Sequence, residues 1–168
     1  MQILTWNIRW GCGCDERVDF DRIADVILSG DAPDVVCLQE VAINHPGLAG
    51  SRGEDQVAEL SARLPGYSAH YAVGSDLPDE ACGRRLFGNL ILSRLPVLQV
   101  FRHSLPWPAD PACASMPRVA VEAVVATPDG PLRVVTTHLE YYSQLQRRAQ
   151  LRALRALLDE GGGHAGAR

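Results

Sequence analysis

The sequence contains no lysine, no CxxC pair and no long apolar run. All 16 basic residues are arginines, and 20 acidic residues outnumber them, so the formal net charge is −4. Proteins that grip long nucleic-acid duplexes usually carry a basic surface. The charge balance therefore argues against a dedicated DNA-coating role, but it is compatible with a small phosphorylated substrate.

Other absences restrict the class of protein further. No apolar stretch approaches the ~18–20 residues that span a bilayer, and residues 1–6 lack the basic n-region of a secretory signal. We therefore expect no membrane span and a cytoplasmic location. The five cysteines have no zinc-site spacing, which favours reduced thiols over a metal centre.

Apolar periodicity and turn residues divide the chain into short elements. Residues 74–85 and 104–117 are polar or rich in proline and are expected to be loops. A Pro-Asp-Gly turn joins the last two strands into a hairpin. Strands are predicted over 2–6, 35–38, 67–73, 86–92, 96–101, 119–126 and 132–137.

Three helices are predicted from their capping residues. Asp19 can cap the first helix. Ser51 with Glu54, and Ser143 with Gln146, have the spacing of capping boxes for the second and third helices. The apolar stripe of the third helix is expected to consist of Leu151, Leu154 and Leu158.

Helices at both ends of the chain, with many strands between them, predict an α/β fold. We expect a partial four-layer α/β/β/α sandwich of mixed, largely antiparallel sheets. The length of 168 residues fits one domain, expected over residues 1–160. Residues 161–168 contain nothing to pack and are predicted to be a disordered tail.

Three polar residues each directly follow a predicted strand, namely Asn7, Glu40 and His138. If these strands are neighbours in one sheet, their ends meet at one edge, where a rigid scaffold can position functional groups. A carboxylate with an amide suits Mg²⁺. Taken singly, each residue has another interpretation: a turn asparagine, a solvated glutamate or a structural histidine.

Four motifs together resemble the endonuclease/exonuclease/phosphatase superfamily, which includes exonuclease III-type nucleases, neutral sphingomyelinases and inositol-phosphate phosphatases. The chain is similar to a bacterial member. The second and fourth motifs, which end in Leu-Gln-Glu-Val and Thr-His-Leu, are specific when found together. In chain order the motifs are Thr5-Trp6-Asn7-Ile8-Arg9, residues 34–41, residues 88–94 and Thr136-Thr137-His138-Leu139.

The resemblance implies a role for each site residue. Glu40 would be the metal-binding carboxylate, and Asn7 would support the metal and the substrate phosphate. His138 would be catalytic, contacting the phosphate and stabilising its charge. Arg118 is a second phosphate-binding candidate, although it could also be a solvated arginine at the start of a strand.

Two adjacent aromatic residues, Tyr141 and Tyr142, follow the last motif. They could line a substrate cleft or pack against the third helix. Asn89 and Ser93 are interpreted as scaffold residues.

The implied reaction is hydrolysis of a phosphodiester or phosphomonoester assisted by Mg²⁺, with Mn²⁺ as a possible substitute. The substrate could be nucleic acid, phospholipid or a small phosphoester. The family carries two further motifs after the third helix, Gly-Asp-Phe-Asn and Ser-Asp-His, and this sequence has neither. We therefore expect the 168 residues alone to be inactive or nearly so.

Two alternatives from other functional classes stay open. The chain could be a non-catalytic remnant that retains weak metal or phosphate binding. It could also be a partner-binding module, because exposed sheet edges would allow strand addition or self-association.

Overall fold

The computed structural model describes residues 1–80 and 83–161. Its strands are β1 (Ile3–Asn7), β2 (Val35–Ile43), β3 (Ser68–Asp79), β4 (Gly83–Ser93), β5 (Val97–Ser104), β6 (Val119–Thr127) and β7 (Gly130–Thr137). Its helices are α1 (Phe20–Leu28), α2 (Gln56–Arg63) and α3 (Gln144–Gly161), with a single helical turn, η1 (Arg9–Gly11). None of the described helices is long and apolar enough to cross a membrane.

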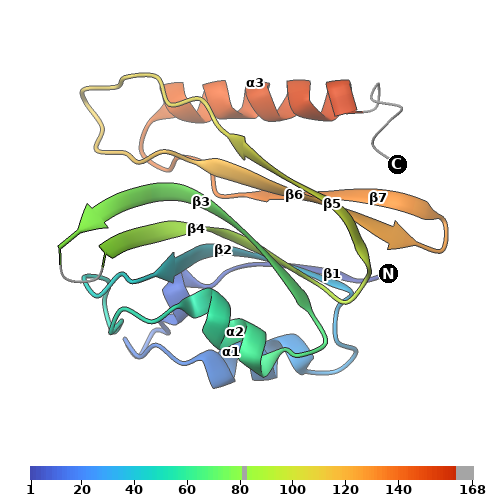
Figure 1. Ribbon diagram of the computed structural model, residues 1–168. Coiled ribbons are helices and arrows are strands. Elements are labelled where there is room, and N and C mark those ends of the chain that lie inside the picture. The colour runs from blue at the N-terminus through green and yellow to red at the C-terminus, as the bar shows by residue number, and fades with distance from the viewer. Residues whose placement is uncertain (81–82, 162–168) are drawn as a thin grey trace.

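The elements form four layers (Figure 1), as predicted. Helices α1 and α2 cover one sheet, of order β1-β2-β4-β3, and α3 lies beyond a second sheet, of order β5-β6-β7. Strands β1 and β2 run parallel, and the other strand pairs are antiparallel. The predicted fold class is therefore confirmed.

Two apolar layers hold the sandwich together. One lies between α1, α2 and the first sheet, and the other lies between the two sheets. Alternate residues of β2 serve the two layers, with Val36 and Leu38 on the helix side and Val35 and Cys37 on the inter-sheet side. Each such side chain stabilises the fold by about 1.5–3 kcal/mol when it is fully buried.

The inter-sheet layer does not reach β1. Ile3 pairs with Val35 in the parallel ladder, so the two side chains share one face of the sheet. Val35 is fully buried, whereas Ile3 is 48% exposed. The outer edge of the first sheet is therefore open on the side that faces the second sheet.

Several local predictions are confirmed by hydrogen bonds. The side chain of Asp19 accepts the backbone N–H of Arg22 at 2.9 Å and caps α1. Ser143 accepts the backbone N–H of Gln146 at 3.2 Å at the start of α3, which is the serine half of the predicted capping box. The glutamine half is not formed, because the side chain of Gln146 donates to Pro108 O instead. The hairpin of β6 and β7 closes at Gly130, where φ is 111°.

The prediction of a loop over residues 74–85 is wrong, apart from residues 81–82, which lie outside the described part of the chain. Strands β3 and β4 continue through this stretch as a long hairpin. Salt bridges join their side chains, at 2.6 Å between Arg84 and Asp76 and 3.2 Å between Arg85 and Asp79. Polar residues that pair across strands give no apolar alternation, so the pattern did not reveal them.

Two helix predictions also need correction. Ser51 and Glu54 bond to each other in the preceding turn, and Asp55 caps α2 instead. On α3, Leu151 and Leu158 are 51% and 57% exposed, so the predicted stripe does not face the sheet.

The inner side of α3 carries buried glutamines. Gln146 donates to Pro108 O, and Gln150 donates to Pro106 O. Gly161 belongs to α3, so the predicted tail does not begin there. The rest of that tail, residues 162–168, lies outside the described residues.

Candidate active site

The site begins where the parallel pairing of β1 with β2 ends, at Asn7 and Gln39. Strand β2 continues to Ile43, so Glu40 lies within the strand and does not follow it as predicted. Asn7 lies beside Gln39 in the ladder, so its side chain is next to Glu40. Asn7 Nδ2 donates to Glu40 Oε1 at 2.9 Å, and Asn7 Oδ1 accepts the backbone N–H of Arg9 at 3.0 Å. The amide is therefore held on both sides and supports the carboxylate.

A bulge in β2 brings Glu40 to this position. The ladder with β4 shifts register between Gln39 and Val41, and Glu40 has a φ of 60°. Because strand residues alternate between faces, a regular strand would point Glu40 into the helix-side core beside Leu38. The bulge places Val41 there instead, and the carboxylate stays at the sheet edge.

Glycine is required opposite the bulge. Gly88 pairs with Val41, and a Cβ at position 88 would lie 1.9 Å from the carbonyl oxygen of Ala72. No side chain fits at that distance, so the close approach of the strands beside the site depends on this residue.

His138 reaches the site from the second sheet. It follows β7, and its Nε2 lies 3.2 Å from Glu40 Oε1. The sequence argument for a common edge was conditional on the strands before Asn7, Glu40 and His138 being neighbours in one sheet. That condition holds for β1 and β2 but not for β7, which belongs to the other sheet.

A buried hydrogen bond joins the two sheets directly behind the site. Gln39 Nε2 donates to Thr136 Oγ1 at 2.8 Å. These residues precede Glu40 and the Thr137-His138 pair, so the bond brings the ends of β2 and β7 together. Asn89 Nδ2 also donates across the sheets, to Val119 O at 2.8 Å, in keeping with a scaffold role.

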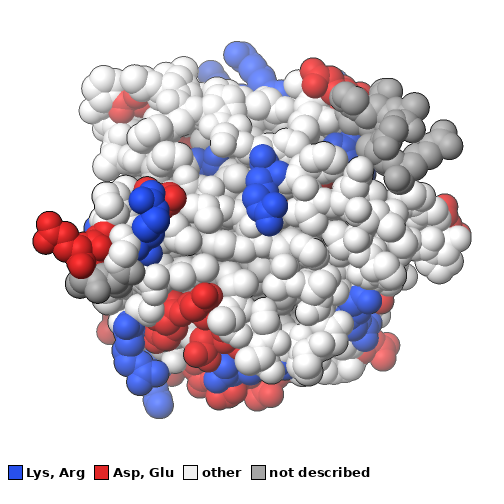
Figure 2. Space-filling view, viewed as in Figure 1, with Lys and Arg blue, Asp and Glu red and all other residues white. Residues whose placement is uncertain are grey.

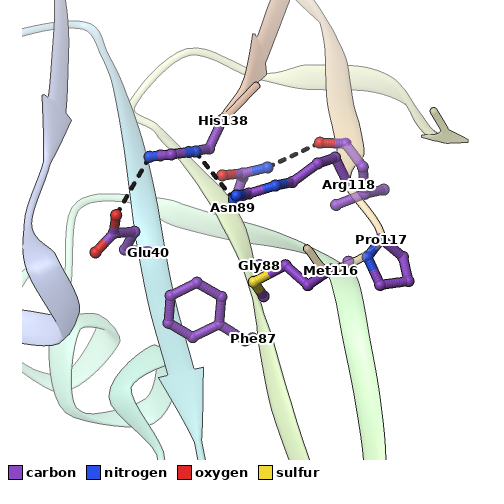
Figure 3. A pocket seen from close by; sticks show the side chains of 10 residues that line it. Glu40, Phe87, Gly88, Asn89, Met116, Pro117, Arg118 and His138 are labelled. Carbon is purple, nitrogen blue, oxygen red and sulfur yellow. Dashed lines mark hydrogen bonds and ion pairs between the residues drawn. The ribbon is translucent and has the colours of Figure 1, made fainter. Parts of the chain in front are cut away.

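Arg118 is an internal residue of the cluster, so the alternative of a solvated arginine is wrong. Its side chain is only 11% exposed. Its Nε and Nη2 donate to Glu140 Oε2 at 3.2 and 3.0 Å, and its Nη1 lies 3.0 Å from His138 Nδ1. The four predicted site residues, Asn7, Glu40, Arg118 and His138, therefore lie in one connected cluster. Figure 3 shows three of them, Glu40, Arg118 and His138.

Glu140 is a residue that sequence reasoning missed. Its side chain is fully buried. The only signal in the sequence was an acidic residue two positions after His138, and its partner Arg118 lies 22 residues earlier. That separation hides the pair from any local pattern.

The surroundings keep both carboxylates of the cluster ionised. Hydrogen bonds from His138 and Asn7 outweigh burial and hold the pKa of Glu40 below its usual value. Burial opposes the ionisation of Glu140, but hydrogen bonds from the Tyr142 backbone and Arg118 lower its pKa overall. Both groups are therefore anionic at neutral pH.

A small pocket lies at the centre of the cluster (Figure 3). Its space of about 10 Å³ is close to what one water molecule needs. The lining residues are Glu40, Gly74, Phe87, Gly88, Asn89, Met116, Pro117, Arg118, Val119 and His138.

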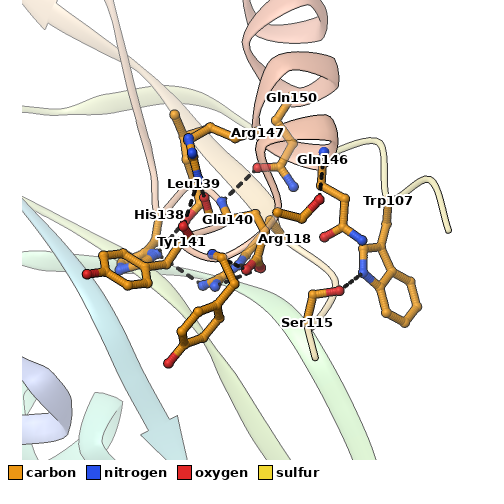
Figure 4. Close-up of polar contacts among 12 residues, drawn as sticks. Trp107, Ser115, Arg118, His138, Leu139, Glu140, Tyr141, Gln146, Arg147 and Gln150 are labelled. Atoms are coloured by element: carbon orange, nitrogen blue, oxygen red, sulfur yellow. Dashed lines mark hydrogen bonds and ion pairs between the residues drawn. The ribbon is translucent and has the colours of Figure 1, made fainter. Parts of the chain in front are cut away.

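Tyr141 lies beside His138 (Figure 4), and both Tyr141 and Tyr142 are on the surface. They are 74% and 70% exposed, and their rings meet edge to face at 5.1 Å between centroids. The alternative in which they pack against the third helix is therefore wrong. The other alternative, in which they line a substrate cleft, stays a prediction.

Backbone strain collects at the same edge. Arg9, Trp10 and Glu40 all have positive φ, at 47°, 47° and 60°, although none of them is glycine. Such conformations cost about 1–3 kcal/mol each and cluster at functional sites.

The donor set fits a hard cation in part. A carboxylate and an amide oxygen are ligands that Mg²⁺ accepts while it keeps several waters. Among residues 1–80 and 83–161, no group of three or more His, Cys, Asp or Glu could hold a metal ion. Metal binding at this edge would therefore depend on Glu40, the carboxylate that Asn7 contacts.

A four-layer sandwich of this topology, with the polar cluster at the ends of both sheets, is a phosphoesterase fold. The chain belongs to the endonuclease/exonuclease/phosphatase family, whose model matches residues 4–165. The resemblance inferred from the motifs is confirmed. Among curated proteins, no sequence matches this chain.

Solved structures agree with this assignment. The chain is 32% identical to an endonuclease/exonuclease/phosphatase from Beutenbergia cavernae, with a TM-score of 0.74 over 92% of this chain and 43% of that one. For a Bacteroides thetaiotaomicron mannosyl-6-phosphatase the identity is 18%, the TM-score 0.70 and the coverage 99% and 61%. For a Neisseria 3′ phosphatase bound to a product DNA hairpin, the identity is 18% and the TM-score 0.58, over 99% of this chain and 54% of that one.

The two phosphatases are too distant in sequence to support more than a common fold. This chain spans about half the length of the solved structures that it matches, from 43% to 61% for the first two described.

Proposed function

We propose that this chain carries the metal- and phosphate-binding half of a Mg²⁺-dependent phosphoester hydrolase. The observation that carries the proposal is the direct contact between Glu40 and His138, which arrive from different sheets and meet at 3.2 Å. Glu40 would hold the metal, and Asn7 would orient the carboxylate. Mn²⁺ would fit the same oxygen donors.

Bound Mg²⁺ would polarise a phosphoryl oxygen and neutralise its developing charge. The protein residues would do the rest. The lowered pKa of Glu40 keeps its carboxylate available as a ligand at neutral pH. His138 and Arg118 would donate N–H groups to the phosphate oxygens, which is how imidazole and guanidinium groups stabilise phosphates.

We further propose that the 168 residues alone turn over little or no substrate. Hydrolysis also needs a base that activates the attacking water. Within the described residues, the cluster provides one ionised glutamate for the metal and a second, Glu140, whose oxygens already accept from Arg118 and Tyr142. The base and a second metal carboxylate would have to come from elsewhere.

The substrate class is a phosphoester, and the charge distribution disfavours a long duplex. The arginine side chains on the face shown in Figure 2 are scattered among other residues and form no continuous patch there. The two distant phosphatases are named for a mannosyl 6-phosphate and a DNA 3′ end. A small phosphoester or a phosphorylated end suits this chain better than a duplex.

A second candidate, a partner-binding module, is favoured by the open edge at β1. Ile3 is 48% exposed on the face where the neighbouring strand is buried. An exposed apolar strand edge can pair with another chain. Self-association through β1 would appear as a concentration-dependent mass in light scattering, and Ile3→Lys would abolish it.

Metal binding tests the proposal directly. Mn²⁺ titrated into the folded chain should show a bound signal in electron paramagnetic resonance that Glu40→Gln removes. A matched control is Glu122→Gln, which alters a buried glutamate of the second sheet. Equal Mn²⁺ binding by the wild type and Glu40→Gln would refute the role of Glu40.

Hydrolysis of bis-p-nitrophenyl phosphate with Mg²⁺ completes the test. We expect no turnover from the wild type despite metal binding. Turnover that disappears in Glu40→Ala would support the hydrolase but refute the proposed incompleteness.

A further inference from the structure

The segment after His138 is fixed to α3 by its backbone (Figure 4). The N–H of Glu140 donates to Gln150 Oε1 at 2.9 Å. Arg147 Nη1 donates to the carbonyl oxygens of Glu140 and Tyr141 at 2.8 and 2.7 Å. These bonds hold Glu140 in place independently of its side chain.

The carboxylate of Glu140 is also fully engaged. Its Oε1 accepts the backbone N–H of Tyr142 at 2.9 Å, and its Oε2 accepts two N–H groups of Arg118. Because the side chain is fully buried, water does not compete for these bonds. The guanidinium therefore has one orientation, in which Nη1 points at His138.

This orientation decides where His138 carries its proton. A guanidinium N–H can only donate, so the 3.0 Å contact of Arg118 Nη1 with His138 Nδ1 is a hydrogen bond when that nitrogen accepts. The neutral ring then carries its hydrogen on Nε2, which lies 3.2 Å from Glu40 Oε1. The N–H is thus presented to the side of the cluster where the carboxylate lies.

A second hydrogen-bond acceptor near His138 Nδ1 makes this tautomer depend on the position of Arg118. His138 Nδ1 also lies 2.9 Å from the carbonyl oxygen of Leu139. If Arg118 were no longer held beside the ring, a proton on Nδ1 could donate to that carbonyl. The ring would then adopt the Nδ1–H tautomer.

We propose that Glu140 is a positioning residue of the candidate site. It acts through Arg118 to hold His138 in the Nε2–H tautomer, with that N–H aimed at Glu40. The effect on the histidine follows from the contacts alone. The consequence for phosphate rests on the proposed function, because a misplaced Arg118 and His138 would bind phosphate less tightly.

The second sheet offers a matched control. Glu122 is also buried and accepts Arg133 Nε at 2.7 Å, while its other oxygen lies 2.9 Å from His103 Nε2. Glu122→Gln therefore breaks a comparable pair beside a different histidine.

The test is the ¹⁵N–¹H spectrum of the full chain labelled on histidine, recorded near pH 8, with His138 assigned through His138→Asn. In the wild type we expect the Nε2–H pattern for His138. Glu140→Gln should abolish that pattern and leave the signals of His103 unchanged. Glu122→Gln should change the signals of His103 and leave the pattern of His138 unchanged. An unchanged His138 pattern in folded Glu140→Gln would overturn the proposal.

A double variant covers the case in which Glu140→Gln does not fold. Glu140→Gln with Arg118→Met removes both buried charges and should fold, because no unpaired charge remains. It should also lack the Nε2–H pattern, and retention of that pattern would overturn the proposal.

Inorganic phosphate then separates this inference from the proposed function. Titration followed by the same spectrum should give about tenfold weaker binding for Glu140→Gln than for Glu122→Gln, the scale of losses seen when supporting residues are removed. Absence of phosphate binding in the wild type, with the tautomer change intact, would refute the phosphate site but support the positioning role.

Discussion

Two Arg–Glu pairs lie on the second sheet, one at the candidate active site and one on the face directed away from the inter-sheet core. In Arg118–Glu140 the side chains are 11% and 0% exposed, and in Arg133–Glu122 they are 25% and 2% exposed. Each pair has a histidine neighbour. His138 contacts the arginine of its pair, whereas His103 contacts the glutamate.

The two pairs differ in whether the group that contacts the histidine can accept a hydrogen bond or can only donate one. A carboxylate accepts a proton-bearing nitrogen, so Glu122 is compatible with either charge state of His103. A guanidinium only donates, so Arg118 requires an unprotonated nitrogen on His138. The two similar buried pairs thus act differently on their histidines, because one histidine contacts the arginine of its pair and the other contacts the glutamate.

The largest expected effect is on stability. Glu140→Gln should lower the free energy of unfolding by about 3–5 kcal/mol, because it leaves a buried arginine without its counter-ion. Glu122→Gln should cost less, since Arg133 can reach water more readily. Urea denaturation monitored by circular dichroism measures both, and a larger loss for Glu122→Gln would invert the comparison.

The next effect separates the two regions by metal affinity. Asn7→Ala should weaken Mn²⁺ binding about tenfold, because removal of groups that orient a metal ligand typically costs 10–100-fold. Glu122→Gln should leave the affinity unchanged. Calorimetric titration provides both values, and equal losses would mean that the variants act through global stability.

Acid should weaken both pairs. Hydrogen bonds overcome burial and lower the pKa of Glu122 and Glu140 in the folded state. A lowered folded pKa contributes stability above the unfolded value, about 4.3 for glutamate, and that contribution is lost as the pH falls through the folded pKa. The urea concentration at the unfolding midpoint should therefore decrease as the pH drops below about 4.3, the unfolded pKa. It should decrease less steeply in Glu140→Gln than in the wild type. An unchanged slope in that variant would contradict this assignment.

The smallest effect calibrates the others. Arg84 and Asp76 form an exposed pair, with side chains 59% and 43% exposed. Asp76→Asn should change the free energy of unfolding by less than about 1 kcal/mol, as is usual for surface pairs. A loss as large as that of Glu140→Gln would show that burial does not explain the difference.

Local chemistry made most of the fold predictable. Asp19, Ser143 and the turn at Gly130 do what their residue types favour, because capping and turn formation depend on a few neighbours. The strands over 67–73 and 86–92 were predicted, but their continuation as a long hairpin was missed because Asp76 and Arg84 stabilise it by pairing across strands. The predicted leucine stripe of α3 was wrong because buried glutamines occupy the inner side of that helix.

The candidate site was predictable only in part. Asn7, Glu40 and His138 were found because each directly follows an apolar stretch predicted as a strand, within a family motif. Their contacts depend on long-range features, namely the bond between Gln39 and Thr136 and the bulge in β2. Neither leaves a periodic trace in the sequence.

The positive φ of Glu40 has a consequence for protein engineering. Glycine adopts that conformation without the steric cost that glutamate bears. A selection for thermal stability alone would therefore tend to replace the residue that we expect to bind the metal. Increased heat resistance and loss of the site would then arise from the same substitution, as in other proteins whose stability and activity trade against each other.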